Sequence, residues 1–348
     1  MLADCIFYIL STIFIILTLL PFIKSPHWAI RVWDFPRFQI FCIILLVLTF
    51  AGIFVKFDFW LKWVLLALLF KTLFFLFWFI YPYSFLSKKM LINEPEKQPK
   101  NTIKLLTANV YQENQSFQKT IDLISEVSPD VVFLLETNQK WKSAMQVLKK
   151  DFPYFIEVPK ENTYGLLFYS KLAFENYEIN YWIDKEIPSI VADVQVRDER
   201  VRLYGIHPTP PVPQENTEST ERDAEILLVG KKAKSFDGPS IVFGDLNDVA
   251  WSHTTRLFLR ISEMLDPRIG RGMYSTFHAK YPLMRWPLDH FFVSSHFRLI
   301  DLKVEKGIDS DHFPISIHLS IQSEIKEKEL NASKGDKEEA NEIIDEAK

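Results

Sequence analysis

The chain has 348 residues and a formal net charge of −4, and 48% of its residues are apolar, including 30 phenylalanines. This length exceeds one ordinary small domain and leaves room for a sizeable core. The near-neutral charge balance argues against a strongly basic nucleic-acid-binding protein.

Apolar residues are concentrated in the first 85 positions, in three runs with almost no charge. The runs cover about residues 6–23, 38–55 and 60–82. Each is close to the roughly 20 residues that a helix needs to cross a bilayer. The first run has no basic residue before it and no small-residue cleavage site after it, which argues against a cleaved signal peptide. We therefore predict a membrane domain over residues 1–85 with three transmembrane helices.

Lysine and arginine are unequally distributed on the two sides of these predicted helices. One side carries Lys24, Arg31, Arg37, Lys88 and Lys89, and the other carries Lys56 and Lys62. Because short cytoplasmic loops are enriched in Lys and Arg, this asymmetry favours a cytoplasmic C-terminal domain.

The remainder of the chain divides into a linker, a mixed α/β domain and a tail. Residues 86–101 are polar and contain proline, and from residue 102 strand-like runs such as IKLLTANV and VVFLLETN alternate with helical stretches. Some strands form hairpin-like pairs, so we predict an α/β sandwich over residues 102–320 rather than a purely parallel sheet. Residues 321–348, with nine acidic and five basic residues, predict a disordered or weakly helical tail.

Polar side chains stand at the ends of the predicted strands. They are Asn109, Glu136, His207, Asp245, Asn247, Asp289, Asp311 and His312. Catalytic groups concentrate on loops that a rigid scaffold positions, and carboxylates gathered in this way can hold a hard cation such as Mg²⁺. The only two cysteines, Cys5 and Cys42, lie in the apolar part, so residues 102–320 can contain neither a disulfide nor a cysteine metal site.

The order TANV, PDVVFLLET, GIHP, GDLND, LDHFFVS and SDHFP resembles the endonuclease/exonuclease/phosphatase superfamily, which has the deoxyribonuclease-I-like fold. The resemblance covers about residues 102–320 and implies a four-layer α/β sandwich, here preceded by three transmembrane helices. It also implies a metal-dependent hydrolase of ester bonds, with Mg²⁺ (or Mn²⁺) as cofactor and water attacking phosphorus.

The resemblance implies a role for each strand-end residue. Glu136 matches the carboxylate that binds the metal, Asn109 the amide that supports it, and Asp311 a second carboxylate on the metal side. Asp245 matches the residue that orients and deprotonates the water. An extended chain would place the Asn247 side chain on the same face as Asp245, where it could hold the phosphate.

The two histidines complete the set of roles that the resemblance implies. His312 matches the histidine that contacts phosphate, with Asp289 as the carboxylate that orients it, and His207 matches a histidine near the leaving group. A carboxylate partner raises the pKa of a histidine, so His312 can hold a proton near neutral pH.

Departures from the nuclease pattern favour a membrane-proximal substrate. Tyr111 and His290 replace residues common in family nucleases, and the loop HPTPPVP has no Lys or Arg to grip a DNA backbone. These features resemble a membrane-anchored bacterial branch, which is described with its catalytic domain outside the cytoplasm, against the charge count above. We predict a multi-pass protein of a bacterial inner or plasma membrane that contacts the lipid bilayer and hydrolyses a phosphate ester, lipid-linked or otherwise membrane-proximal. The alternative is a membrane-anchored nuclease.

Overall fold

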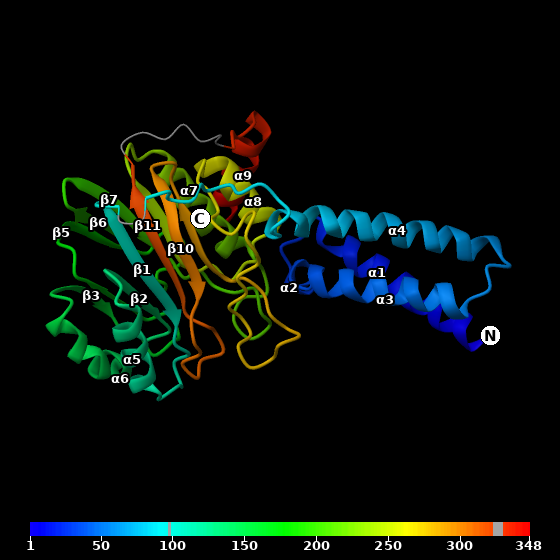
Figure 1. The fold of residues 1–348 in the computed structure, drawn as a ribbon, viewed down its shortest axis with the longest axis horizontal. Coiled ribbons are helices and arrows are strands. Elements are labelled where there is room, and N and C mark those ends of the chain that lie inside the picture. Colours follow the sequence, from blue (N-terminus) through cyan, green and yellow to red (C-terminus); the bar gives the residue numbers. More distant parts are fainter. Residues whose placement is uncertain (97–98, 323–329) are drawn as a thin grey trace.

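The computed structural model describes residues 1–96, 99–322 and 330–348. It begins with a bundle of three long helices, which extends from the rest of the molecule (Figure 1). The bundle consists of α1 (Leu2–Leu19), α3 (Arg37–Phe54) and α4 (Trp60–Ile80), with the short helix α2 (Trp28–Arg31) between α1 and α3.

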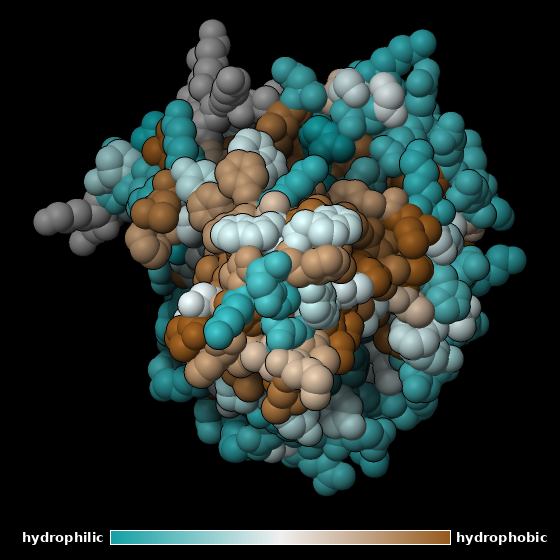
Figure 2. All heavy atoms as spheres, turned by 90° about the vertical axis from the view of Figure 1, so that its right-hand side faces the viewer, coloured by the Kyte–Doolittle hydropathy of each residue, from teal (hydrophilic) through white to brown (hydrophobic). Residues whose placement is uncertain are grey.

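All three long helices are long and apolar enough to cross a membrane. At 1.5 Å per residue, the 18 residues of α3 extend about 27 Å, close to the roughly 30 Å of a hydrocarbon core. Only 22–28% of the residues in these spans are buried inside the protein. Seen along the bundle from its free end, hydrophobic side chains gather at the centre over the helices, and the rim is mostly hydrophilic (Figure 2).

The domain that follows has two stacked sheets with helices on both outer faces (Figure 1), which confirms the four-layer α/β sandwich. The six-stranded sheet has the order β10-β11-β1-β2-β4-β3, and the five-stranded sheet has the order β5-β6-β7-β8-β9. The strands of the first sheet are β1 (Thr102–Asn109), β2 (Val131–Leu135), β3 (Tyr154–Val158), β4 (Leu166–Ser170), β10 (Phe297–Val304) and β11 (Ile315–Ile321). Those of the second are β5 (Phe174–Asn180), β6 (Ser189–Val196), β7 (Glu199–Gly205), β8 (Ser240–Asp245) and β9 (Asp289–Val293).

The helices α5 (Phe117–Val127) and α6 (Gln139–Ala144) pack on the first sheet. The second sheet is covered by α7 (Thr220–Lys234) and α8 (His253–Ser262). Alternation along β1 shows how the layers form: Ile103 and Leu105 belong to the core between the sheets, whereas Leu106 belongs to the core under α5. A strand buried on both faces reads as a continuous apolar run, as Val131–Leu135 of β2 and Ile241–Phe243 of β8 do.

Strand direction brings the predicted site residues to one edge of the sandwich. Strands β1 and β2 are parallel, as are β7 and β8. Strand β9 is antiparallel to β8, and β11 is antiparallel to β1. The C-terminal ends of four strands therefore meet the N-terminal ends of β9 and β11.

The segment between bundle and sandwich is attached to the sandwich over much of its length. Leu91 is fully buried in the core between the sheets. Asn93 pairs with Leu299 of β10, and the Glu94 N–H donates to the Leu299 carbonyl at 2.8 Å. Residues 86–101 were expected to act as a flexible linker, but one apolar side chain and an edge strand are enough to dock part of the segment. Residues 97–98 of this linker lie outside the described residues.

The C-terminal tail, predicted from the sequence to be disordered or weakly helical, contains a helix of 13 residues. Residues Lys334–Glu346 form helix α9, which begins with a capping box at Ser333 and Asp336. Ala340 and Ile344 of α9 are buried against α7 and α8. The helix forms because this apolar pair, four residues apart in a charged composition, makes one helix face. Residues 323–329 of the tail lie outside the described residues.

The bundle is joined to the sandwich by specific contacts. The Trp251 indole N–H donates to the Asp34 carbonyl at 2.7 Å, and the Tyr83 hydroxyl donates to the Ala250 carbonyl at 2.6 Å. The N–H of Trp28 donates to the Thr217 carbonyl at 2.8 Å. These bonds connect loops of the sandwich to the helix ends that face it.

Candidate active site

Asp245 and Asp289 face each other across the pair β8–β9. Asp245 ends β8, Asp289 begins β9, and the two are partners in the strand register. The glycine before Asp245 is required by this packing. Gly244 has φ of 133°, and a Cβ there would lie 2.0 Å from the Ile206 carbonyl oxygen. The strand can therefore approach the end of β7 only with glycine at this position.

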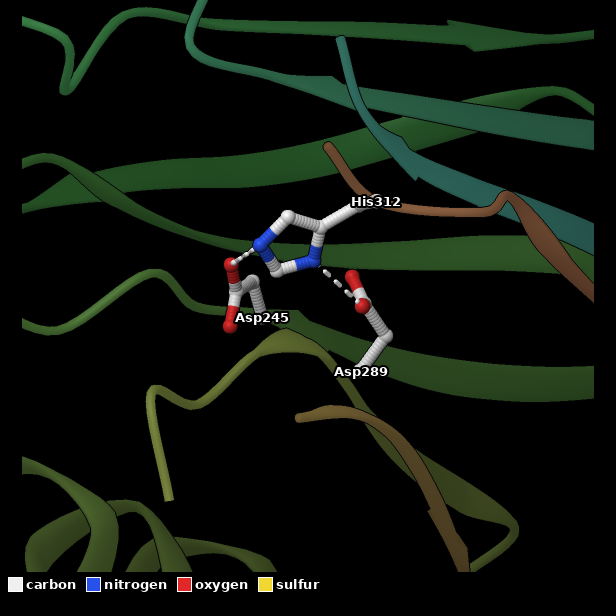
Figure 3. A group of neighbouring side chains, drawn as sticks. All are labelled: Asp245, Asp289 and His312. Carbon is white, nitrogen blue, oxygen red and sulfur yellow. Dashed lines mark hydrogen bonds and ion pairs between the residues drawn. The ribbon is translucent and has the colours of Figure 1, made fainter. Parts of the chain in front are cut away.

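His312 stands between these two carboxylates (Figure 3). Its Nδ1 lies 2.8 Å from Asp289 Oδ2, and its Nε2 lies 3.5 Å from Asp245 Oδ2. Burial alone would lower the pKa of His312, but the two carboxylates outweigh burial and raise that pKa to about 10. His312 is therefore an imidazolium at neutral pH, suited to binding an anion.

Asn109 connects the two sheets at the site. Its Nδ2 donates to Glu136 Oε1 at 2.7 Å and to Asp245 Oδ2 at 3.1 Å. Glu136 follows β2 with φ of 57°, and the Gln112 N–H donates to its Oε2 at 3.3 Å. Burial raises the pKa of Glu136 to about 7, although the bond from Asn109 opposes this. The neighbours of Glu136 therefore do not supply enough positive charge to offset the burial of its carboxylate.

Asp311 is held beside this group by Ser310. The Ser310 hydroxyl donates to the Asn109 carbonyl at 2.8 Å and lies 3.3 Å from Asp311 Oδ1. The Asp311 charge contributes to the raised pKa of Glu136.

The site gathers four carboxylates, Glu136, Asp245, Asp289 and Asp311, with one imidazolium among the described residues. This excess of oxygen donors, of which Asp245 and Asp289 are buried, fits a hard divalent cation. Asp245, Asp289 and His312 also offer ligand atoms within 4.8 Å of one another, a spacing that could hold a metal ion. Both His312 nitrogens already face carboxylates and the ring is protonated, so this trio offers a metal its carboxylate oxygens rather than the imidazole.

His207 lies on the other side of Asp245. Its Nε2 is 3.9 Å from Asp245 Oδ2, and its buried Nδ1 has no partner among the described residues. Burial lowers the pKa of His207, with Asp245 opposing. The imidazole is therefore neutral at pH 7 and can exchange a proton. The Tyr164 ring packs beside it, with 5.4 Å between ring centroids.

Asn247 reaches the site differently from the sequence argument. Strand β8 ends at Asp245, and Asn247 has φ of 50°, so the segment is a turn rather than an extended strand. The Asn247 N–H donates to Asp245 Oδ1 at 3.0 Å, and its Nδ2 donates to the Pro208 carbonyl at 3.0 Å. The same-face prediction is wrong because the side chain of Asp245 caps this turn. Asn247 is near Asp245 through the turn and joins the loops after β7 and β8.

Four residues that the sequence analysis did not select contact this constellation. Gln112 supports Glu136, and Arg222 donates to the Asn247 carbonyl at 2.8 Å. Phe277 packs on the His312 ring at 4.8 Å between centroids, and Tyr164 packs on His207. Only Tyr164, immediately before β4, had a strand-end position that could have revealed it. The other three come from a helix and from loops without any motif.

The family assignment follows from a match to the family model described as the Endonuclease/Exonuclease/phosphatase family, over residues 106–312. This match spans more than half of the chain and includes every strand-end residue discussed above. The chain belongs to the endonuclease/exonuclease/phosphatase family. It is therefore a metal-dependent hydrolase of the phosphoesterase and nuclease type.

Solved structures of the family share this fold at low sequence identity. D. rerio TDP2 in complex with a single-strand DNA product has a TM-score of 0.52 and 17% identity, covering 63% of this chain and 99% of that chain. A family protein from Beutenbergia cavernae has a TM-score of 0.51 and 15% identity, covering 64% and 72%. One from Bacteroides thetaiotaomicron has a TM-score of 0.50 and 16% identity, covering 66% and 98%. No curated protein matches this chain in sequence.

Proposed function

We propose that this protein is a membrane-tethered, Mg²⁺-dependent phosphoesterase that hydrolyses a phosphate ester of a lipid or of another substrate at the membrane surface. The observation that carries the proposal is that the loops bearing the site residues are also the loops that contact the helix bundle. Three loops show this in turn.

The loop after β7 begins at His207 and reaches the bundle at Thr217, which accepts a bond from Trp28. The loop after β8 follows Asp245 and reaches Asp34 through Trp251. The loop before Asp289 contains Trp286, whose indole nitrogen lies 3.3 Å from Gln39 Oε1 at the start of α3. The catalytic edge of the sandwich therefore adjoins the bundle, and the site would stand close to the bilayer if α1, α3 and α4 span it.

Hydrolysis assigns a task to each of these side chains. Asp245 takes a proton from the attacking water. Burial raises the pKa of its carboxyl while His312 lowers it, and a raised pKa makes a carboxylate a stronger base. The His312 imidazolium, held by Asp289, attracts the phosphate oxygens. His207, neutral and on the opposite side of Asp245, can donate an N–H hydrogen bond to the leaving oxygen, which takes its proton from water.

A cation held by the carboxylates of Glu136 and Asp311 would stabilise negative charge on the phosphate oxygens. Asn109 orients this group, since its amide nitrogen touches both Glu136 and Asp245.

A pocket beside His207 favours a substrate other than a long polyanion. It has a volume of about 520 Å³, and its lining includes Tyr164 together with the acidic residues Asp184, Glu186, Glu215 and Glu221. Four carboxylates would repel the continuous phosphate backbone of a nucleic-acid strand.

The experiment is a substrate panel with the full-length protein in nanodiscs and Mg²⁺, containing polyprenyl diphosphate, phosphoinositides, duplex DNA and RNA. We expect the largest kcat/KM for a lipid substrate, and a kcat lower by about 10²-fold or more for Asp245→Asn. If DNA or RNA is the best substrate, the lipid proposal is wrong and the nuclease takes its place.

A further inference from the structure

The turn formed by residues 280–285 lies between the active site and the bundle. We call it the 280–285 loop. It projects from the long segment between α8 and β9, which extends toward the near end of α3 (Figure 1). Three of its side chains are apolar and exposed: Tyr281 by 59%, Leu283 by 85% and Met284 by 53%. No other described part of the chain covers them.

This loop is fixed in place. The Met284 N–H donates to the Tyr281 carbonyl at 2.9 Å, and the His278 N–H donates to the Met284 carbonyl at 2.9 Å, so the turn is closed on itself. Arg285 Nη2 donates to the Ala279 carbonyl at 3.0 Å. Its exposed side chains are therefore presented by a rigid turn.

The position of the loop relative to the bundle is set by Gln39. The Gln39 side-chain nitrogen donates to the Leu283 carbonyl at 3.1 Å. Gln39 is the third residue of α3, which starts at Arg37 and whose length matches a hydrocarbon core. If α3 spans the bilayer, Leu283 lies within about one helical turn of its surface.

The composition of the loop suits this depth. Tyrosine is amphipathic and is enriched at membrane interfaces, and Leu and Met are apolar. Lys280 and Arg285 stand at the two ends of the loop, where their charges can reach anionic lipid headgroups. The Arg285 guanidinium also closes the turn and lies over the Phe313 ring at 4.9 Å, so Lys280 is the freer of the two charges. An apolar tip with a lysine at its base is complementary to an anionic bilayer surface rather than to water.

The base of the loop reaches the catalytic groups. The Ala279 N–H donates to the Asp311 carbonyl at 2.6 Å. Phe277 contacts the His312 ring on one side and stacks on Trp286 on the other, at 6.1 Å between centroids. The element facing the bilayer is thus continuous with the wall of the anion site.

We propose that the 280–285 loop inserts its apolar tip into the lipid bilayer beside the bundle and so holds the active site at headgroup level. This inference rests on the membrane location in the proposed function and deepens it by naming the surface through which the site meets lipid.

The test measures lipid contact directly and requires no substrate. Cys5 and Cys42, the only cysteines of the chain, are replaced by serine, and Leu283→Cys is labelled with an environment-sensitive fluorophore. The full chain is reconstituted in nanodiscs of phosphatidylcholine and phosphatidylglycerol, with or without lipids brominated in the acyl chain near the headgroup. Tyr177→Cys on β5, 54% exposed and on the side of the sandwich away from the bundle (Figure 1), is the matched control. Met284→Cys is a second reporter.

We expect brominated lipid to quench the labels at positions 283 and 284, and not the label at 177. We also expect Leu283→Asp to abolish quenching at 284, because a carboxylate opposes insertion. Quenching at 283 no greater than at 177 would overturn the inference. Quenching at 284 that persists with Leu283→Asp would overturn it too, since the dye rather than the loop would then be entering the lipid.

These outcomes are independent of the substrate panel. Quenched labels with no lipid turnover would refute the proposed substrate and leave the loop assignment standing. Lipid turnover with unquenched labels would support the proposed substrate and refute the loop assignment.

Discussion

At the residue scale, the carboxylates of the site differ in charge environment because their neighbours differ. Asp289 and Asp245 face an imidazolium, and His312 takes a pKa of about 10 from them. Glu136 has an amide and other carboxylates nearby, and burial raises its pKa to about 7. The first arrangement is partly neutralised by the proton on His312, whereas no imidazolium among the described residues is hydrogen-bonded to the second. In the proposed function, this difference separates the group that binds phosphate from the group that holds the cation.

Asp245→Asn tests the base. An amide cannot accept the proton of water, so we expect kcat to fall by about 10²-fold or more, with KM little changed. Steady-state kinetics on the best substrate of the panel gives both values. Asp309→Asn is the control, because Asp309 is 48% exposed and paired with Lys119, an interaction that contributes little. A kcat for Asp245→Asn within a few-fold of wild type would assign the base elsewhere.

Metal removal tests the other half of the site. We expect EDTA to abolish activity and Mg²⁺ or Mn²⁺ to restore it, because the donor set is made of oxygens. Glu136→Gln removes one charge from this set and should raise the Mg²⁺ concentration required for half-maximal activity. Full activity of Glu136→Gln without added metal would contradict the assignment.

At the element scale, the helices that cover the second sheet pack through an apolar layer that also contains side chains of unexpected type. Helix α7 buries the carboxyl of Glu225, hydrogen-bonded to Ser189 of β6. Helix α9 adds Ala340 and Ile344 to the same layer. Because Ile190 of β6 pairs with Gly205 at the end of β7, the Glu225–Ser189 contact lies toward the catalytic edge. Variants of these contacts are therefore followed by thermal unfolding rather than by activity.

Glu225→Gln should change how stability depends on pH. Burial raises the pKa of Glu225 from 4.5 to about 7. The folded protein therefore binds more protons than the unfolded chain between these values. The contribution of Glu225 to stability is complete below pH 4.5 and is lost as the pH rises to about 7, by about 3 kcal/mol.

The neutral amide of Glu225→Gln avoids this loss. The thermal midpoint of the variant relative to wild type should therefore increase between about pH 5 and pH 8. The thermal midpoints of both proteins are measured across this pH range. A midpoint difference that does not change with pH would show that Glu225 is already ionised in the folded protein.

Ile344→Ala tests whether α9 is part of the folded domain. Ile344 is 3% exposed, so its truncation should remove about 2–4 kcal/mol and lower the thermal midpoint by about 5 °C or more. Glu342→Ala, on the exposed side of the same helix, should leave the midpoint nearly unchanged. Equal midpoints for the two variants would mean that α9 does not pack on α7 and α8 in solution.

At the scale of the whole molecule, the bundle and the sandwich are joined on the side where the chemistry occurs. Buried groups seal the junction: Arg37 pairs with Asp34 and lies over the Phe79 ring, 3.9 Å from its centroid. Arg37 is one of the cations in the count that predicts orientation. Because it is buried in this junction, its position is explained by docking as well as by membrane topology.

The membrane side of the site is tested with a reporter at the C-terminus, after α9. The Lys and Arg asymmetry predicts the cytoplasmic side. A reporter pair active on opposite sides, such as a fluorescent protein and an alkaline phosphatase, reads the location. A signal from the extracytoplasmic side would show that the charge count is outweighed, in agreement with the membrane-anchored branch that the sequence resembles.

Local patterns in the sequence were sufficient for the three apolar helices, the sandwich and the strand-end residues. An apolar run of bilayer length and a polar residue after a buried strand are both determined within a few neighbouring positions. Parallel and antiparallel pairing then brings Asn109, Glu136, Asp245, Asp289 and His312 to one edge, as the family resemblance implies.

Only the tertiary structure decided the rest, because the relevant partners are distant in the chain. Leu91 is recruited into a core by strands that it does not neighbour in sequence, and Asn247 is placed by a turn bonded to Pro208. The pKa values of His312 and Glu136 depend on burial and on charges that meet only after folding. The contact of Gln39 with Leu283 spans 244 positions, so the approach of an active-site loop to the bundle cannot be read from any local pattern.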